Sequence, residues 1–313
     1  MTIVAGSRYV AMGSSAAAGL GIPHRVPGSP RRAGRSTGNY AHHVARALGL
    51  DLHDVSFSGA TSADLLRPSG YGQPAQLDAV TPATRLVTLT VGGNDVGYVP
   101  RLMAASVAWP LRALPRFANL VAAFGDPDAT EERFAQLATN FAAIARRLRQ
   151  QAPRCRVIAV DYLTILPPPG TPCSRRPRAD VVAWGRAVAA RLATVTREAA
   201  RRAGWEYIAA SAASADHHAW SAEPWTRRFH PALRDGAPYH PNAAGMAAVA
   251  DLICAALARQ LPPSAPAGGG QERRSDPALH TKDVAQRSAQ LASRHPALDP
   301  LSRLGAPKLS SRL

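Results

Sequence analysis

Lysine is almost absent from this sequence. Lys282 and Lys308 are the only two, so arginine supplies nearly all the positive charge behind a formal net charge of +16. Basic proteins gain affinity for nucleic acids by neutralising phosphates, but this arginine is spread along helical stretches in pairs such as Arg146-Arg147. Aromatic residues make up only 6% of the chain, and no basic patch interleaves with them. The sequence therefore argues against a specific nucleic-acid partner.

Cysteine is also scarce. Cys155, Cys173 and Cys254 are the only three, and their wide spacing fits neither a disulfide framework nor a zinc site. No run of about 18 apolar residues is present, so we expect no transmembrane segment. The N-terminus leads directly into a strand, without the charged leader, apolar stretch and cleavage site of a signal peptide. These absences predict a cytoplasmic protein.

What the sequence does contain is ample material for a core, because 46% of its 313 residues are hydrophobic. The character changes after Leu261, where PPSAPAGGGQERRSDP begins a polar, basic stretch with little apolar periodicity. We predict a folded domain over residues 1–261 and a disordered tail over residues 262–313, rich in Pro, Gly and Ser.

Within the domain, strand-like and helix-like patterns alternate. Alternation of this kind indicates right-handed crossovers and a parallel sheet that is covered on both faces. We therefore predict a three-layer α/β/α sandwich with a five-stranded, flavodoxin-like sheet. The strand-like runs are Arg8–Met12, His53–Phe57, Leu86–Val91, Arg156–Asp161 and Trp205–Ile208. The helical candidates are Asn39–Leu48, Pro74–Val80, Val99–Phe124, Thr130–Gln151, Arg178–Ala203 and Asn242–Gln260. Two long irregular stretches, Leu166–Arg178 and Ser211–Tyr239, are expected to line the rim of a site.

Chemically useful residues follow the first three strands and precede the last helix. Ser15 follows the first strand in AMGSSAAAG, Gly59 follows the second, and Asn94 follows the third in VTLTVGGND. His240 lies just before the last helix, in YHPNAAG. Each segment alone is also an ordinary turn or helix cap. Because the carboxyl ends of parallel strands lie along one edge of a sheet, the four residues can converge around one pocket.

Together these residues make a complete set for acyl transfer. Ser15 can act as the nucleophile and His240 as its base. The backbone N–H groups of Ser15 and Gly59, with the side-chain amide of Asn94, can form an oxyanion hole. We predict a serine hydrolase that acts on carboxylic esters, and Asp95 is expected to support its loop.

The chain resembles the SGNH hydrolases, also called GDSL esterases and lipases, from about Arg8 to Gln260. YVAMGSSAAAG, FSGATSADLL, VTLTVGGND and YHPNAAG are similar, in the same order, to motifs of the actinobacterial secreted lipases and esterases. The resemblance implies the roles just given for Ser15, Gly59, Asn94 and His240. It also implies a small-molecule ester substrate and no metal or organic cofactor.

The chain departs from this family in several places. Ser14 stands where the family has Asp, and Ala16 to Ala18 replace Tyr-Ser-Ser. The family's Asp three residues before the histidine is here Ala237. Two groups remain as candidates to orient His240. One is the backbone carbonyl of Trp225, since Pro224-Trp225 resembles a pair that does so in some relatives; the other is the carboxylate of Asp235.

The resemblance also implies two lost disulfides. Ala33 and Phe57 stand at positions that pair in secreted relatives, and Trp220 stands where Cys173 would find its partner. The loss of both bridges favours a reducing compartment.

Other functions remain open from the sequence. A carbohydrate acetyl-esterase, a lysophospholipase and a thioesterase are alternatives within the family. A weakened domain that acts as a binding module is an alternative outside enzymology. Asp216, His217 and His218 form a cluster that could suggest a metal site, but no further ligand has a convincing spacing, so we predict a solvated loop.

Overall fold

A computed structural model gives the fold. It describes residues 3–70, 72–108, 111, 114–115, 118–119, 127–171, 173, 177–230 and 236–259. The predicted tail, residues 262–313, lies outside these ranges.

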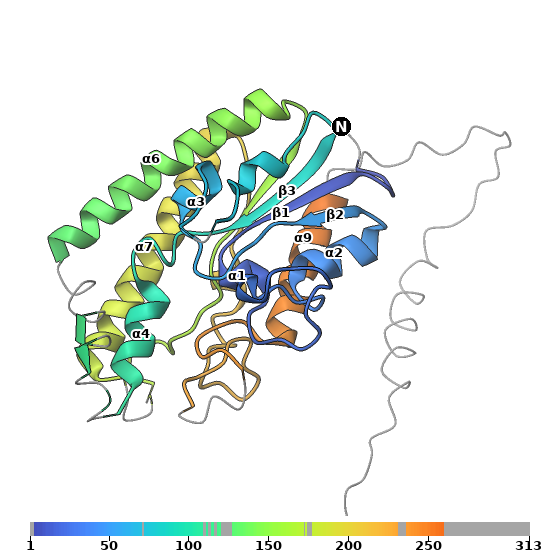
Figure 1. Ribbon diagram of the computed structural model, residues 1–313. Helices are drawn as coiled ribbons and strands as arrows, with labels where there is room; N and C mark the ends of the chain where they lie inside the picture. The colour runs from blue at the N-terminus through green and yellow to red at the C-terminus, as the bar shows by residue number, and fades with distance from the viewer. Residues whose placement is uncertain are drawn as a thin grey trace, which may run out of the picture. The chain divides into compact units, whose positions relative to one another are not determined.

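The centre of the molecule is a five-stranded sheet in the order β2-β1-β3-β4-β5 (Figure 1). Every pair of neighbouring strands is parallel. This confirms the predicted α/β fold class. The strands are β1 (Arg8–Gly13), β2 (Asp51–Asp54), β3 (Thr84–Thr90), β4 (Arg156–Val160) and β5 (Glu206–Ile208).

Helices cover both faces of the sheet (Figure 1). On β1, Tyr9 and Ala11 pack into a cluster with α2 and α9, while Val10 and Met12 pack into a cluster with the helices opposite. This alternation follows from the two-residue repeat of a strand. The first face carries α2 (Tyr40–Leu48) and α9 (Ala243–Ala258). The second carries α3 (Ser62–Leu66), α4 (Tyr98–Ser106), α6 (Pro127–Gln151) and α7 (Ala179–Ala203). The short helices are α1 (Ser15–Ala18), α8 (Ala210–Ala213) and two 3₁₀ turns, η1 (Arg31–Ala33) and η2 (Gln76–Ala79).

Three predicted elements differ from the structure. The second strand begins and ends earlier than predicted, at β2, although Phe57 N–H still donates a hydrogen bond to Gly13 O of β1. The stretch Pro74–Val80 forms only the 3₁₀ turn η2, because so short a segment cannot complete several α-helical bonds. The long helix predicted over Val99–Phe124 is interrupted, since α4 ends at Ser106 and Val107 is extended.

The positions at which the resemblance places disulfides are packed with apolar side chains. Ala33 and Phe57 form a small buried cluster with Ala60, and Ser58 N–H donates to Ala33 O at 2.9 Å. This cluster holds the turn after β2 without a covalent bond. Cys155, Cys173 and Cys254 are all free. None of the described helices is both long and apolar enough to cross a bilayer.

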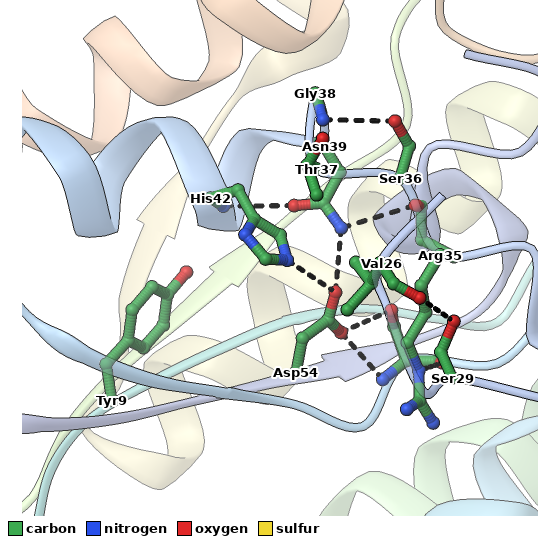
Figure 2. Close-up of polar contacts among 12 residues, drawn as sticks. Tyr9, Val26, Ser29, Arg35, Ser36, Thr37, Gly38, Asn39, His42 and Asp54 are labelled. Carbon is green, nitrogen blue, oxygen red and sulfur yellow. Dashed lines mark hydrogen bonds and ion pairs between the residues drawn. The ribbon is translucent and has the colours of Figure 1, made fainter. Parts of the chain in front are cut away.

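A buried polar network fixes the start of α2 (Figure 2). Asn39, which is fully buried, caps the helix by accepting a hydrogen bond from His42 N–H at 3.0 Å. Its Nδ2 donates to Asp54 Oδ2 at 2.8 Å and to Ala18 O at 3.2 Å. Asn39 therefore joins the end of α1, the start of α2 and the end of β2.

Candidate active site

Ser15 lies just after the carboxyl end of β1, the strand beside the central β3. Gly13 has φ +133°, and a Cβ there would lie 2.2 Å from Thr90 O, so only glycine lets β1 approach β3 this closely. Ser15 then begins α1 and is 8% exposed. The turn of small residues in AMGSSAAAG thus brings the serine to the sheet edge.

His240 contacts Ser15 directly. Its Nε2 lies 2.8 Å from Ser15 Oγ, and its Nδ1 lies 2.7 Å from the carbonyl oxygen of Pro238. A carbonyl can only accept, so the proton of the neutral ring is on Nδ1, and Nε2 is free to accept the serine proton. This is the arrangement of a nucleophile with its base.

The hydrogen-bond acceptor on His240 Nδ1 is not the predicted Trp225 carbonyl. The Trp225 carbonyl accepts instead from Asn242 N–H at 2.9 Å, and it therefore supports the start of α9. Asp235 lies outside the described residues. The carbonyl on Nδ1 belongs to Pro238, two residues before the histidine. No side-chain pattern could have indicated it, because every residue carries a carbonyl.

Tyr239 makes the Pro238 contact possible. Its φ of +59° is one of two positive values among the described residues other than glycine. This left-handed turn folds the Pro238 carbonyl back toward the imidazole of His240, at a cost of roughly 1 kcal/mol or more for a bulky residue. Tyr239 is 2% exposed as a whole residue, and its hydroxyl lies 2.7 Å from Ser106 Oγ of α4. Burial and this hydrogen bond hold the strained turn in place.

Burial also lowers the pKa of His240. The charge of Arg227 lowers it further, while the hydrogen bond to the Pro238 carbonyl acts in the opposite direction. The base therefore stays neutral, and able to accept a proton, to a lower pH than an ordinary histidine.

The predicted oxyanion donors lie on adjoining loops. Asn94 Nδ2 donates one hydrogen to Ala60 O at 2.9 Å, which ties the loop after β3 to the turn after β2. An amide has two N–H groups, so one remains to meet an oxyanion. Gly59, beside Ala60, has φ +84° and is exposed. Asn94, Ser15 and His240 line one cavity of about 30 Å³, whereas Gly59 is not among its walls.

Asp95 supports this loop, as expected. Its carboxylate accepts from Ser62 N–H and from Ser62 Oγ, which in turn accepts from Asn140 Nδ2 at 2.8 Å. Burial raises the pKa of the Asp95 carboxyl, and the bonds from Ser62 oppose that rise. The loop after β3 is thereby fastened to α3 and α6.

The two long loops contribute unequally to the cavity. Thr226 and Tyr239, from the second, line it together with His240. The described residues of Leu166–Arg178 do not, although Ile165 directly before them does.

The loop predicted to be solvated is only partly so, because His218 is buried and both histidines have partners within the loop. His217 stacks on Trp225 with ring centroids 4.1 Å apart, and His218 Nδ1 accepts from Trp220 N–H at 3.1 Å.

The residues around Ser15 that differ from the family motif have surroundings that suit them. Ala16, Ala17 and Ala18 are buried, so alanine suits their positions. The Ser14 hydroxyl meets that of Tyr162, a residue that the sequence reasoning missed. The sequence could have indicated it, because Tyr162 comes shortly after β4 and so lies at the same edge of the sheet as Ser15.

Comparison with known proteins agrees with this geometry. Residues 11–248 match the GDSL-like Lipase/Acylhydrolase family. The chain is 35% identical over 251 residues to Lipase 2 of Streptomyces coelicolor, a match that covers 76% of this chain and 81% of the relative.

Solved structures share the fold. The crystal structure of an extracellular lipase from Streptomyces rimosus superposes with a TM-score of 0.61 at 25% identity, covering 80% of this chain and 100% of that one. Phospholipase A1 from Streptomyces albidoflavus NA297 gives a TM-score of 0.64 at 23% identity, covering 80% and 99%. On the extent of the family match and the identity to Lipase 2, this chain belongs to the GDSL-like lipase/acylhydrolase family.

Proposed function

We propose that this protein hydrolyses carboxylic esters through an acyl-enzyme on Ser15, with His240 as the base. The observation that carries the proposal is the 2.8 Å contact between Ser15 Oγ and His240 Nε2 in a ring whose other nitrogen is held by a carbonyl. The similarity to lipases of Streptomyces supports the same reaction class.

In the first half of the reaction, Ser15 Oγ attacks the ester carbonyl carbon while His240 Nε2 takes the serine proton. The oxyanion is stabilised by the N–H groups of Ser15 and Gly59 and by the Asn94 amide. The intermediate then collapses, and the departing alkoxide takes the proton from His240. In the second half, water attacks the acyl-enzyme by the same route and releases the carboxylic acid.

Replacing the nucleophile tests the proposal. Because the cavity beside Ser15 is small, p-nitrophenyl acetate, with its small acyl group, is the first substrate to use. Ser15→Ala should lower kcat on the order of 10⁴-fold and abolish labelling by a fluorophosphonate probe. Ser221→Ala, which removes a loop hydroxyl bonded to His218 O, is the control and should leave both unchanged. Full activity in Ser15→Ala would show that the proposal is wrong.

The same probe separates the enzyme from a binding module, which would not react with it. Among the enzyme alternatives, a panel of acetylated sugars, lysophospholipids and thioesters would identify the preferred ester.

We propose further that the protein works in a reducing compartment, the cytoplasm. Support comes from the three free cysteines and from the apolar packing of Ala33 against Phe57, where the resemblance places a disulfide. Cell fractionation with an antibody to the chain tests this.

A further inference from the structure

One hydroxyl touches both halves of the proposed catalytic machinery. Tyr162 lies two residues after the end of β4, and its Oη accepts from Gly93 N–H at 2.9 Å. The same oxygen lies 3.1 Å from Ser14 Oγ. Ser14 immediately precedes the nucleophile Ser15, and Gly93 immediately precedes Asn94. A single side chain therefore spans the turn after β1 and the loop after β3.

The residues on both sides are arranged for this contact. Ser14 occupies the N-cap position of α1, where serine usually bonds to the helix N–H groups, yet it makes no side-chain capping bond. Its hydroxyl turns to Tyr162 instead. On the other side, a Cβ at Gly93 would lie 2.8 to 2.9 Å from atoms of the Tyr162 ring and hydroxyl. Only glycine admits the tyrosine at this distance.

Tyr162 is itself held in place. Its ring packs edge-on against Tyr98 of α4, with centroids 6.5 Å apart and an interplanar angle of 86°. Burial raises the pKa of the Tyr162 hydroxyl to about 12, so it keeps its proton at neutral pH and can donate as well as accept.

We propose that Tyr162 is a positioning residue, which sets the separation between the nucleophile turn and the oxyanion-hole loop through its bonds to Ser14 and Gly93. The inference rests on the proposed function. It gives Ser14 a role in place of the family's Asp, because a short hydroxyl leaves room for the tyrosine oxygen. Ser15 and Asn94 must act on the same carbonyl group, and a shift of about 1 Å between them can cost on the order of 100-fold in rate.

The first test removes only the hydroxyl. Tyr162→Phe should lower kcat for p-nitrophenyl acetate about 10- to 100-fold, with KM changed less than about threefold, because the hydroxyl is bonded to Ser14 and Gly93 and orders the reacting groups. The rate of fluorophosphonate labelling at Ser15 should fall by the same factor. Tyr9→Phe is the matched control, since it also removes a buried hydroxyl pair, Tyr9 Oη to Thr88 Oγ1 at 2.7 Å, away from the site. It should lower Tm about as much and leave kcat unchanged.

The second test asks whether Ser14 acts through Tyr162. Ser14→Ala should lower kcat by about fivefold, and the double variant should be no slower than Tyr162→Phe alone. The inference would be overturned if the kcat losses of Ser14→Ala and Tyr162→Phe multiplied in the double variant. It would also be overturned if Tyr162→Phe had the same kcat and labelling rate as Tyr9→Phe. If Tyr162→Phe does not fold, the Ser14→Ala variant tests the inference alone. A wild-type kcat in Ser14→Ala would then show that the hydrogen bond between Ser14 and Tyr162 does not position the nucleophile. Failure of the proposed function appears separately, as a wild-type protein that the fluorophosphonate does not label at Ser15.

Discussion

At the scale of single residues, the feature that most affects the chemistry is the neutral acceptor on His240. In a full triad a carboxylate stabilises the imidazolium that forms during the reaction. Here the partner is the Pro238 carbonyl, which orients the ring but carries no formal charge. The left-handed Tyr239 supplies that orientation through the backbone. The ring is thus positioned as in a triad with less stabilisation of its cation.

The pH dependence of the reaction follows from this environment. His240 must be neutral to act as a base, and both its burial and the charge of Arg227 lower its pKa below the ordinary 6.5. We expect kcat/KM to be independent of pH around neutrality and to fall only as the pH drops below 6.5. Arg227→Gln removes a positive charge, so it should raise the pKa of His240 and move the acidic limb to higher pH.

A pH–rate profile from pH 4 to 8 checks this prediction. Arg228→Gln is the control, because Arg228 is the exposed neighbour in the chain, and its profile should match the wild type. If the acidic fall of kcat/KM in Arg227→Gln stayed at the wild-type pH or moved to lower pH, the charge of Arg227 would not be a cause of the lowered pKa of His240.

At the scale of secondary structure elements, the site depends on how helix starts are fixed to strand ends. The loop after β3 is fastened through Asp95 to α3 and α6. The start of α2 is fastened through Asn39 to α1 and β2 (Figure 2). Both networks use buried polar groups, and such groups are costly when a partner is removed.

Asn39→Ala should therefore destabilise the fold strongly. It removes the cap of α2 and one donor to the buried Asp54 carboxylate, so we expect a loss of about 2–4 kcal/mol in the free energy of unfolding. Urea denaturation measures it. Thr37→Ala removes an exposed hydroxyl bond to His24 O and should cost less than about 0.5 kcal/mol. Equal losses in the two variants would show that the network contributes little.

At the scale of the whole molecule, the described core is complete by the end of α9. Ile253, Ala256 and Leu257 are the last buried residues of this core, and α9 ends at Ala258. The predicted boundary near residue 261 therefore falls just after the last core residue.

A chain that ends at Pro262 should keep the Tm and the kcat of the full chain, because it retains every buried side chain of the described core. A chain that ends at Asp251 should not fold, since it loses Ile253, Ala256 and Leu257. Thermal unfolding and esterase assays of the two truncations test this. A large loss of Tm on removal of residues 263–313 alone would assign the tail a structural role.

The sequence by itself determined the order of strands and helices and the sheet edge at which Ser15, Gly59, Asn94 and His240 lie. These features follow from local periodicity and from the geometry of parallel strands, which need no knowledge of distant contacts. The bounds of β2 and α4 were less well predicted, because an edge strand and an interrupted helix depend on their neighbours.

Only the tertiary structure decided which groups support the proposed catalytic pair. The acceptor on His240 depends on a positive φ at Tyr239, which local propensity disfavours and which burial against the core maintains. The partner of Ser14 is Tyr162, 148 residues away along the chain. Backbone carbonyls and long-range hydroxyl contacts leave no pattern in a sequence, since any residue can supply the first and only folding creates the second.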